Sequence, residues 1–243
     1  MKHKASEADD QATPSKVRRP AADAPKRGKR TIAVLVGTGA AEETFDVYSD
    51  LLVSHSDFFK AALKQEWKEG QERSVALPED CPEEFEIFYH FVNEGLIFSS
   101  KDSDRGADGK RDAEWSRLTK CWMLGQKLLS TTFKDAILDA ITAKLQLGRH
   151  PTSLYQGPYR DSSPSAAFKK LLTDIVVYLW KDEEIDRRDG LLLYPEFLFD
   201  IAKALSKVKV KGHPVSPPWN IDGNECYYHE HVADGTPCYK TLF

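Results

Sequence analysis

The sequence lacks a long apolar stretch: no run approaches the ~18 residues that a membrane-spanning helix needs. The first residues also lack the apolar core of a secretory signal peptide. Cysteine is scarce, with four in 243 residues, which argues against a disulfide-stapled secreted fold and favours a reducing compartment. We therefore expect an intracellular protein without a membrane partner, in the nucleus, the cytoplasm or both.

Sequence patterns that mark enzymes are also missing. There is no G-x-S-x-G nucleophile elbow, no H-E-x-x-H metal motif and no P-loop. Gly37-Thr38-Gly39 follows the first apolar segment, but Glu42 stands where a dinucleotide-binding fold needs glycine or alanine, so a hairpin turn is the better interpretation. We expect a binding protein and no enzyme.

The remaining composition is that of a globular protein, with 41% hydrophobic and 30% charged residues. Because the net charge is -4, we expect no nucleic-acid binding by the folded part. Residues 1–29 hold few large apolar side chains and are predicted to be a disordered tail. Its basic clusters are either a nuclear localisation signal or a solvated tail; they comprise Lys16, Arg18, Arg19, Lys26, Arg27 and Lys29, continued by Arg30.

Apolar periodicity divides the rest of the chain into three parts and predicts an α+β fold. Residues 30–147 alternate strand and helix patterns, with a polar insertion at 99–113. Within this domain Gly70 is expected to end a helical region, and Thr131 or Thr132 to cap a later helix. Residues 148–211 are predicted to be a small helical region, and 212–243 a Gly/Pro-rich tail.

Several short pieces of the first domain together resemble a BTB/POZ domain. They occur in the family's order and spacing: Phe45-Asp46-Val47-Tyr48, Leu51-Leu52, Ser56-Asp57-Phe58-Phe59, Leu77-Pro78-Glu79-Asp80, Phe85 to Val92, and Asn93-Glu94-Gly95. The resemblance implies the BTB/POZ fold, a small mixed sheet with flanking helical hairpins. The helical region after it is similar to the C-terminal extension of BTB proteins that are abundant in filamentous fungi.

The resemblance also implies self-association, because BTB domains often dimerise through their first strand and first helices. The residues in these positions are Ile32, Val34, Val36, Leu51 and Leu52. The alternative is that Ile32, Val34 and Val36 fill the core of a single chain.

A second implied partner is a cullin scaffold. BTB proteins that bind cullins carry a hydrophobic-x-Glu motif between the second helix and the next strand, where Trp67-Lys68-Glu69 follows Leu63 here. The resemblance thus implies a substrate adaptor for a cullin-type ubiquitin ligase, with these four residues at the interface. Alternatively, Trp67 covers its own domain core, and the chain is a nuclear scaffold associated with transcription or chromatin.

The tail contains four residues of the types that ligate zinc, namely Cys226, His229, His231 and Cys238. Two cysteines and two histidines match a closed, structural, tetrahedral zinc site, although C-x2-H-x-H-x6-C is not a common finger spacing. Two histidines two residues apart point to one side only if the segment is extended. The alternative is a loose tail in which Tyr227 and Tyr228 dock on the helical region.

Overall fold

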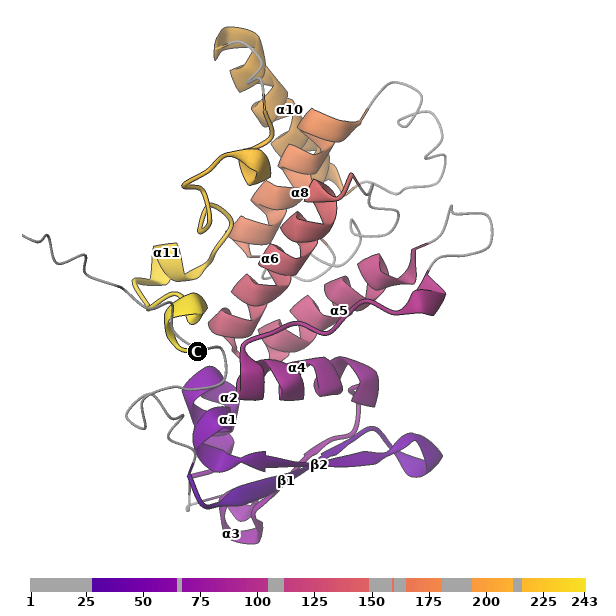
Figure 1. Ribbon diagram of the computed structural model, residues 1–243, viewed down its shortest axis with the longest axis vertical. Coiled ribbons are helices and arrows are strands. Elements are labelled where there is room, and N and C mark those ends of the chain that lie inside the picture. The colour runs from indigo at the N-terminus through magenta and orange to yellow at the C-terminus, as the bar shows by residue number, and fades with distance from the viewer. Residues whose placement is uncertain are drawn as a thin grey trace, which may run out of the picture.

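The computed structural model describes residues 28–64, 67–104, 112–148, 159, 165–180, 194–211 and 216–243, without the side chains of 68, 210 and 211. All but the last two residues of the predicted disordered tail, and residues 105–111 of the polar insertion, lie outside these residues. The described part is a mixed α and β structure, with a small sheet at one end and helices rising from it (Figure 1). None of the described helices is long and apolar enough to cross a bilayer.

The sheet has three strands in the order β2-β1-β3: β1 (Thr31–Val36), β2 (Glu43–Tyr48) and β3 (Ser74–Leu77). β1 is antiparallel to β2 and parallel to β3, so both of its edges are paired. The predicted turn between β1 and β2 is confirmed. Gly37 has φ 87° there, and a side chain would place its Cβ 2.8 Å from the Ala41 carbonyl oxygen.

Three short helices connect β2 to β3: α1 (Ser49–His55), α2 (Asp57–Ala62) and α3 (Lys68–Glu72). Ser56 caps α2, because its hydroxyl accepts a hydrogen bond from the Phe59 amide. The expectation that Gly70 ends the helical region is wrong, because Gly70 lies inside α3 and Arg73, with φ 54°, ends that helix. Glycine is needed here for space: a Cβ would lie 2.2 Å from the Lys64 carbonyl oxygen.

Above the sheet lie α4 (Pro82–Glu94) and the hairpin of α5 (Ala113–Lys127) and α6 (Thr131–Gln146). Phe85, Phe88 and Val92 form an apolar stripe on α4 and are fully buried. The cap of α6 is Ser130, whose Oγ accepts from the Phe133 amide, and not a threonine as predicted. Ser130 is itself fully buried, so its hydroxyl needs this internal partner.

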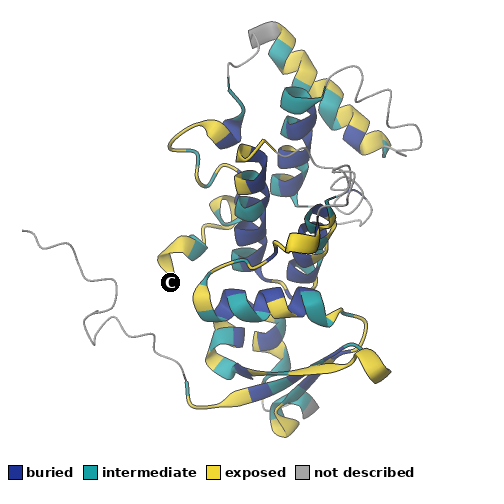
Figure 2. Ribbon diagram, turned by 45° about the vertical axis from the view of Figure 1, so that its right-hand side comes forward, coloured by how far each residue is buried: buried dark blue, intermediate teal, exposed yellow. Residues whose placement is uncertain are grey.

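Two further helices, α8 (Ala166–Leu179) and α10 (Pro195–Lys211), continue the stack away from the sheet (Figure 1). Trp122 of α5 packs against α8, with its ring centroid 4.9 Å from that of Phe168. Buried residues concentrate along α5, α6 and α8, whereas α10 is mostly exposed (Figure 2). The exposed side chains of α10 include Leu198, Phe199 and Leu205.

The last described segment, residues 216–243, runs back along α6 towards α1 and α4 (Figure 1). It contains the 3-10 helices η4 (Pro218–Asn220) and η5 (Tyr239–Thr241) and the short helix α11 (His231–Asp234). Gln146 of α6 donates to the Trp219 carbonyl oxygen, and the Tyr228 hydroxyl donates to Asp174 of α8 at 2.9 Å. The segment therefore bridges α6 and α8, and Tyr228 contacts the helical region, a contact that the sequence predicted only under the alternative of a loose tail.

Candidate metal centre

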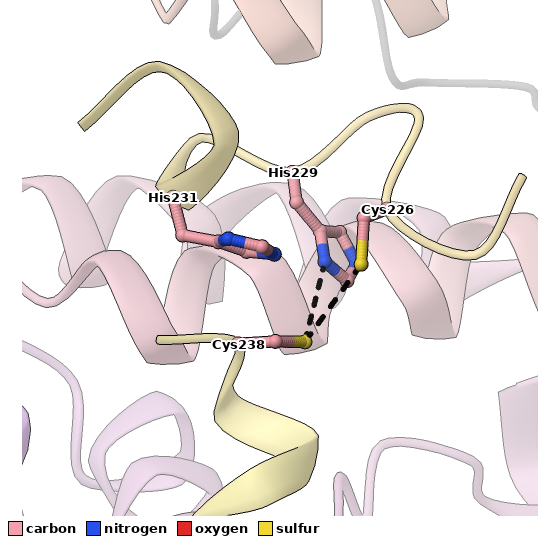
Figure 3. Close-up of side chains that lie close together, drawn as sticks. All are labelled: Cys226, His229, His231 and Cys238. Atoms are coloured by element: carbon pink, nitrogen blue, oxygen red, sulfur yellow. Dashed lines mark hydrogen bonds between the residues drawn. The ribbon is translucent and has the colours of Figure 1, made fainter. Parts of the chain in front are cut away.

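The four tail residues that the sequence singles out lie together in space (Figure 3). Their potential ligand atoms are all within 4.8 Å of one another. The two sulfur atoms are 3.9 Å apart, and the Cys238 sulfur is 3.8 Å from His229 Nδ1. Zinc with Zn–S bonds of ~2.3 Å and Zn–N bonds of ~2.0 Å separates its ligand atoms by about 3.3 to 3.8 Å in a tetrahedron. The Cys2His2 cluster could therefore hold a metal ion.

A turn and a helix start, and not an extended segment, bring the two histidines together. The His229 amide donates to the Cys226 carbonyl oxygen at 3.1 Å, which closes a turn, and His231 begins α11. The two imidazole rings end 5.2 Å apart. Gly235 then ends α11 with φ 68° and lets the chain return to Cys238. The prediction that this spacing requires an extended segment is wrong for that reason.

His229 is oriented by a carboxylate behind it. Its side chain is fully buried, and Nε2 lies 2.9 Å from Oδ1 of Asp139 on α6. When Nε2 carries the proton and donates to Asp139, Nδ1 keeps its lone pair and faces the two sulfur atoms. Carboxylate partners of this kind fix the ring and raise the basicity of metal-ligating histidines.

Asp139 has three donors in all. It also accepts from the Tyr239 hydroxyl at 2.6 Å and from Lys240 Nζ at 2.8 Å. Burial raises the pKa of this carboxyl, but the hydrogen bonds from His229, Lys240 and Tyr239 outweigh burial and hold the pKa below its ordinary value. Asp139 is therefore a negatively charged support for His229 at neutral pH.

His231 supplies an independent sign of an ion. Among the described residues its Nε2 atom is buried and has no hydrogen-bond partner. An unpaired polar atom in such a position costs roughly 1–3 kcal/mol, which a coordinate bond to a metal would remove. Figure 3 shows this ring turned towards the space beside the Cys238 sulfur.

The two cysteines are free thiols at this separation, since a disulfide requires sulfur atoms ~2.05 Å apart. Burial and the hydrogen bond with the Cys238 thiol raise the pKa of Cys226. A bound cation would instead lower the pKa of the cysteine thiols, because it stabilises the thiolates. The donor set is soft and closed, which suits structural zinc better than a hard ion such as calcium or magnesium.

The backbone beside the cluster is anchored on α6. The fully buried Asp135 accepts from the amides of Glu230 and His231 at 2.6 and 3.3 Å. Lys134 of the same helix forms an ion pair with Glu230 at 2.5 Å. Sequence inspection missed these residues, although Asp135 and Asp139 are one helical turn apart and share a face, a pattern that marks a carboxylate-bearing helix surface.

The residues predicted for a cullin interface lie between α2 and β3. Trp67 is 58% exposed, so it does not cover the core, while Leu63 and Glu69 are half-buried. The side chain of Lys68 lies outside the described residues. A hollow of about 520 Å³ opens nearby, lined by Arg30, Ile32, Ser49, Val53, Leu63, Gly70, Gln71 and Arg73.

The residues predicted for dimerisation lie mostly inside this chain. Ile32, Val34, Val36 and Leu52 are buried, and Leu51 is half-buried. Because β1 is paired on both edges and its apolar side chains fill the core, they are not exposed for contact with a second chain. These side chains therefore fit the alternative in which they fill the core of a single chain. Self-association stays a prediction.

Two comparisons with known proteins gave no relatives. No protein-family model matches the chain, and no curated protein matches it. The mixed sheet, the helices around it and the metal-competent cluster are therefore the observations from which a function can be argued.

Proposed function

We propose that this chain is a protein–protein interaction module of the BTB/POZ type that acts as a substrate adaptor for a cullin-type ubiquitin ligase. The arrangement of its first domain supports this proposal. A hairpin of β1 and β2, three short helices, β3, α4 and the α5–α6 hairpin follow one another, and the strands and longer helices keep the order that the resemblance implies. The sheet is small and mixed, as that fold requires.

The observation that carries the proposal is the exposure of Trp67. More than half of this large side chain faces solvent, and tryptophan is the residue type most enriched among interface hot spots. Trp67 lies directly before α3, and its carbonyl oxygen accepts from the Gln71 amide. Its backbone is therefore held in place although its side chain is free to contact a partner.

Close backbone packing fixes the position of this anchor. The Trp67 amide donates to the Lys64 carbonyl oxygen at 3.0 Å, and Gly70 approaches the same carbonyl so closely that no side chain fits. The short helix α3 is thus pressed against the end of α2. Because the backbone at Trp67 is already held by these contacts, it has little conformational entropy to lose on binding, which favours affinity.

The test is calorimetric binding of the purified full chain to the N-terminal region of a cullin, for the wild type and Trp67→Ala. We expect the substitution to weaken binding about 30-fold, equivalent to roughly 2 kcal/mol. Phe199→Ala is the matched control, because Phe199 on α10 is also an aromatic residue with more than half of its surface exposed. Absence of binding at tens of micromolar, or equal losses in both variants, would exclude the adaptor role.

The alternative proposal is a nuclear scaffold associated with transcription or chromatin and without a ligase role. Its supporting feature, the basic segment before β1, falls almost entirely outside the described residues. A fusion of residues 1–30 to a fluorescent protein tests it, since cytosolic fluorescence would remove the argument for nuclear import.

We further propose that the ion of the tail cluster is zinc in a structural role. The two thiolates, the two imidazoles and the carboxylate behind His229 form the donor set that supports this choice. Cys226, His229, His231 and Cys238 would hold the ion, whose contribution is to cross-link a segment with little apolar core of its own. Metal analysis of the wild type and Cys226→Ala tests it: the variant should lose the ion.

A further inference from the structure

The segment Tyr239–Phe243 occupies a site built from α1, α4 and α6. The Phe243 ring is stacked on that of His55 with centroids 5.1 Å apart and an angle of 10°. It also contacts the edge of Phe91 at 5.5 Å. We call His55, Phe91 and Gly95 the aromatic site.

Gly95 makes room for the ring. It ends α4 with φ 72°, and a Cβ at this position would lie 2.5 Å from the Phe243 ring. His55 is buried beside Phe91, and burial lowers its pKa to about 4, so the imidazole is a neutral stacking partner near pH 7. A missing Cβ, a parallel neutral ring and a perpendicular ring together form a receptor for one aromatic side chain.

Tyr239 adds a second anchor four residues earlier. Its ring contacts Phe91 at 5.9 Å, and its hydroxyl donates to Asp139. Lys240 pairs with the same carboxylate. Phe91 thus contacts two aromatic side chains of the segment, four residues apart. Together with the lysine that pairs with Asp139, they define the pattern Tyr-Lys-x-x-Phe.

The segment is held weakly at its end and firmly at its start. Phe243 is 50% and Leu242 48% exposed, so about half of each residue still faces solvent. Cys238, in contrast, belongs to the metal cluster and directly precedes Tyr239. A filled cluster would hold Tyr239 at the site, where a tethered segment has an effective concentration on the order of millimolar.

We propose that the aromatic site is a receptor for a partner segment with the pattern Tyr-Lys-x-x-Phe, which the chain's own Tyr239–Phe243 blocks while the metal cluster is filled. Loss of the ion frees Tyr239–Phe243 and opens the site. The partner is recognised by two aromatic rings four residues apart and by a cation that pairs with Asp139. This interaction surface is separate from Trp67, and it rests on the metal centre and not on cullin binding.

The test uses a fluorescent peptide covering residues 236–243 with serine in place of Cys238, so that the peptide carries no metal-ligating thiol. Its binding to the full chain is followed by fluorescence anisotropy. The receptor chains are the wild type, with and without a zinc chelator, and Tyr239→Ala/Phe243→Ala, in which the site is vacant. We expect the peptide to bind the double variant at least tenfold more tightly than the untreated wild type, and the chelator to raise binding to the wild type.

Two controls decide whether the intended site is used. A peptide with alanine in place of both aromatic residues should not bind. Adding Gly95→Asn to the double variant should weaken binding at least tenfold, because asparagine tolerates a positive φ but brings a Cβ into the space of the ring. Circular dichroism reports whether each variant is folded. If the double variant is unfolded, the comparison of the wild type with and without chelator tests the proposal.

Three outcomes would overturn the proposal. Equal binding to the folded double variant and the untreated wild type would exclude blocking by Tyr239–Phe243. Binding of the peptide without aromatic residues would exclude the receptor. A chelator that strips the ion without raising peptide binding to the wild type would exclude control by the metal.

Discussion

Replacing Asp139 by alanine should weaken metal binding without touching any of the four ligands. The substitution removes the acceptor of His229 Nε2 and leaves the imidazole without the group that orients it. It also removes the partner of Lys240 and of the Tyr239 hydroxyl, both of which belong to the segment that carries Cys238.

The size of the effect follows from the role of this carboxylate. Substituting such outer partners of ligating histidines lowers metal affinity about 10- to 100-fold, equal to about 1.4 to 2.8 kcal/mol. We expect the upper half of that range, because three donors lose their acceptor together. The zinc affinity of Asp139→Asn should lie between those of Asp139→Ala and the wild type, since the amide oxygen still accepts from Nε2 but carries no charge.

The assay is competition for zinc against a chromophoric chelator of known affinity. Asp222→Ala is the control, since Asp222 is an exposed carboxylate on the same segment. An Asp139→Ala protein that holds zinc as tightly as the wild type would refute the support of His229 by Asp139.

Three further predictions concern stability and the position of Trp67. Arg117→Ala should cost about 3–5 kcal/mol in urea unfolding, because it removes the charged partner of the buried Asp104 carboxylate, now 2.8 and 3.0 Å from the guanidinium, and leaves only the Lys101 amide to donate to it among the described residues. A loss below about 1 kcal/mol would contradict this. The pKa of His55 is about 4 in the folded chain, so as pH falls below ~6.5 this imidazole takes up a proton in the unfolded chain but not in the folded one. The free energy of unfolding should therefore drop by about 2 kcal/mol from pH 7 to pH 5. The pH profile of His55→Gln should be flatter. Gly70→Ala should cost about 1–3 kcal/mol and weaken any binding that depends on Trp67, because its Cβ would collide with the Lys64 carbonyl oxygen; unchanged unfolding would refute the close packing of α3.

Local patterns predicted most of the elements. The alternation in β1, the apolar stripe of α4 and the Ser56 cap depend on neighbours in sequence, so the sequence contains the information that fixes them. The identity of the four potential ligands was also available, because cysteine and histidine are the residue types that zinc prefers.

The errors occurred where contacts outside the local apolar pattern decide the structure. Gly70 was expected to end a helix, but it meets a backbone carbonyl from the preceding turn. The histidine spacing predicted an extended segment, whereas the anchoring of Glu230 and His231 on Asp135 favours a turn. The role of Asp139 depends on a contact across 90 residues, which helical periodicity cannot reveal.

The exposed apolar residues of α10 show a second limit. Leu198 and Leu205 are seven residues apart and so share a helical face, which favours burial, yet both side chains are about half exposed among the described residues. Periodicity shows that side chains share a face, but what covers that face depends on the rest of the assembly.

X-ray absorption at the zinc edge, together with metal quantification on the natively purified full chain, tests the central structural claim most directly. The claim is that Cys226, His229, His231 and Cys238 hold one ion and so fix residues 226–243 on α6. We predict one zinc per chain with two sulfur neighbours at ~2.3 Å and two nitrogen neighbours at ~2.0 Å. A chain without bound metal, or with a Cys226–Cys238 disulfide in its place, would contradict the account.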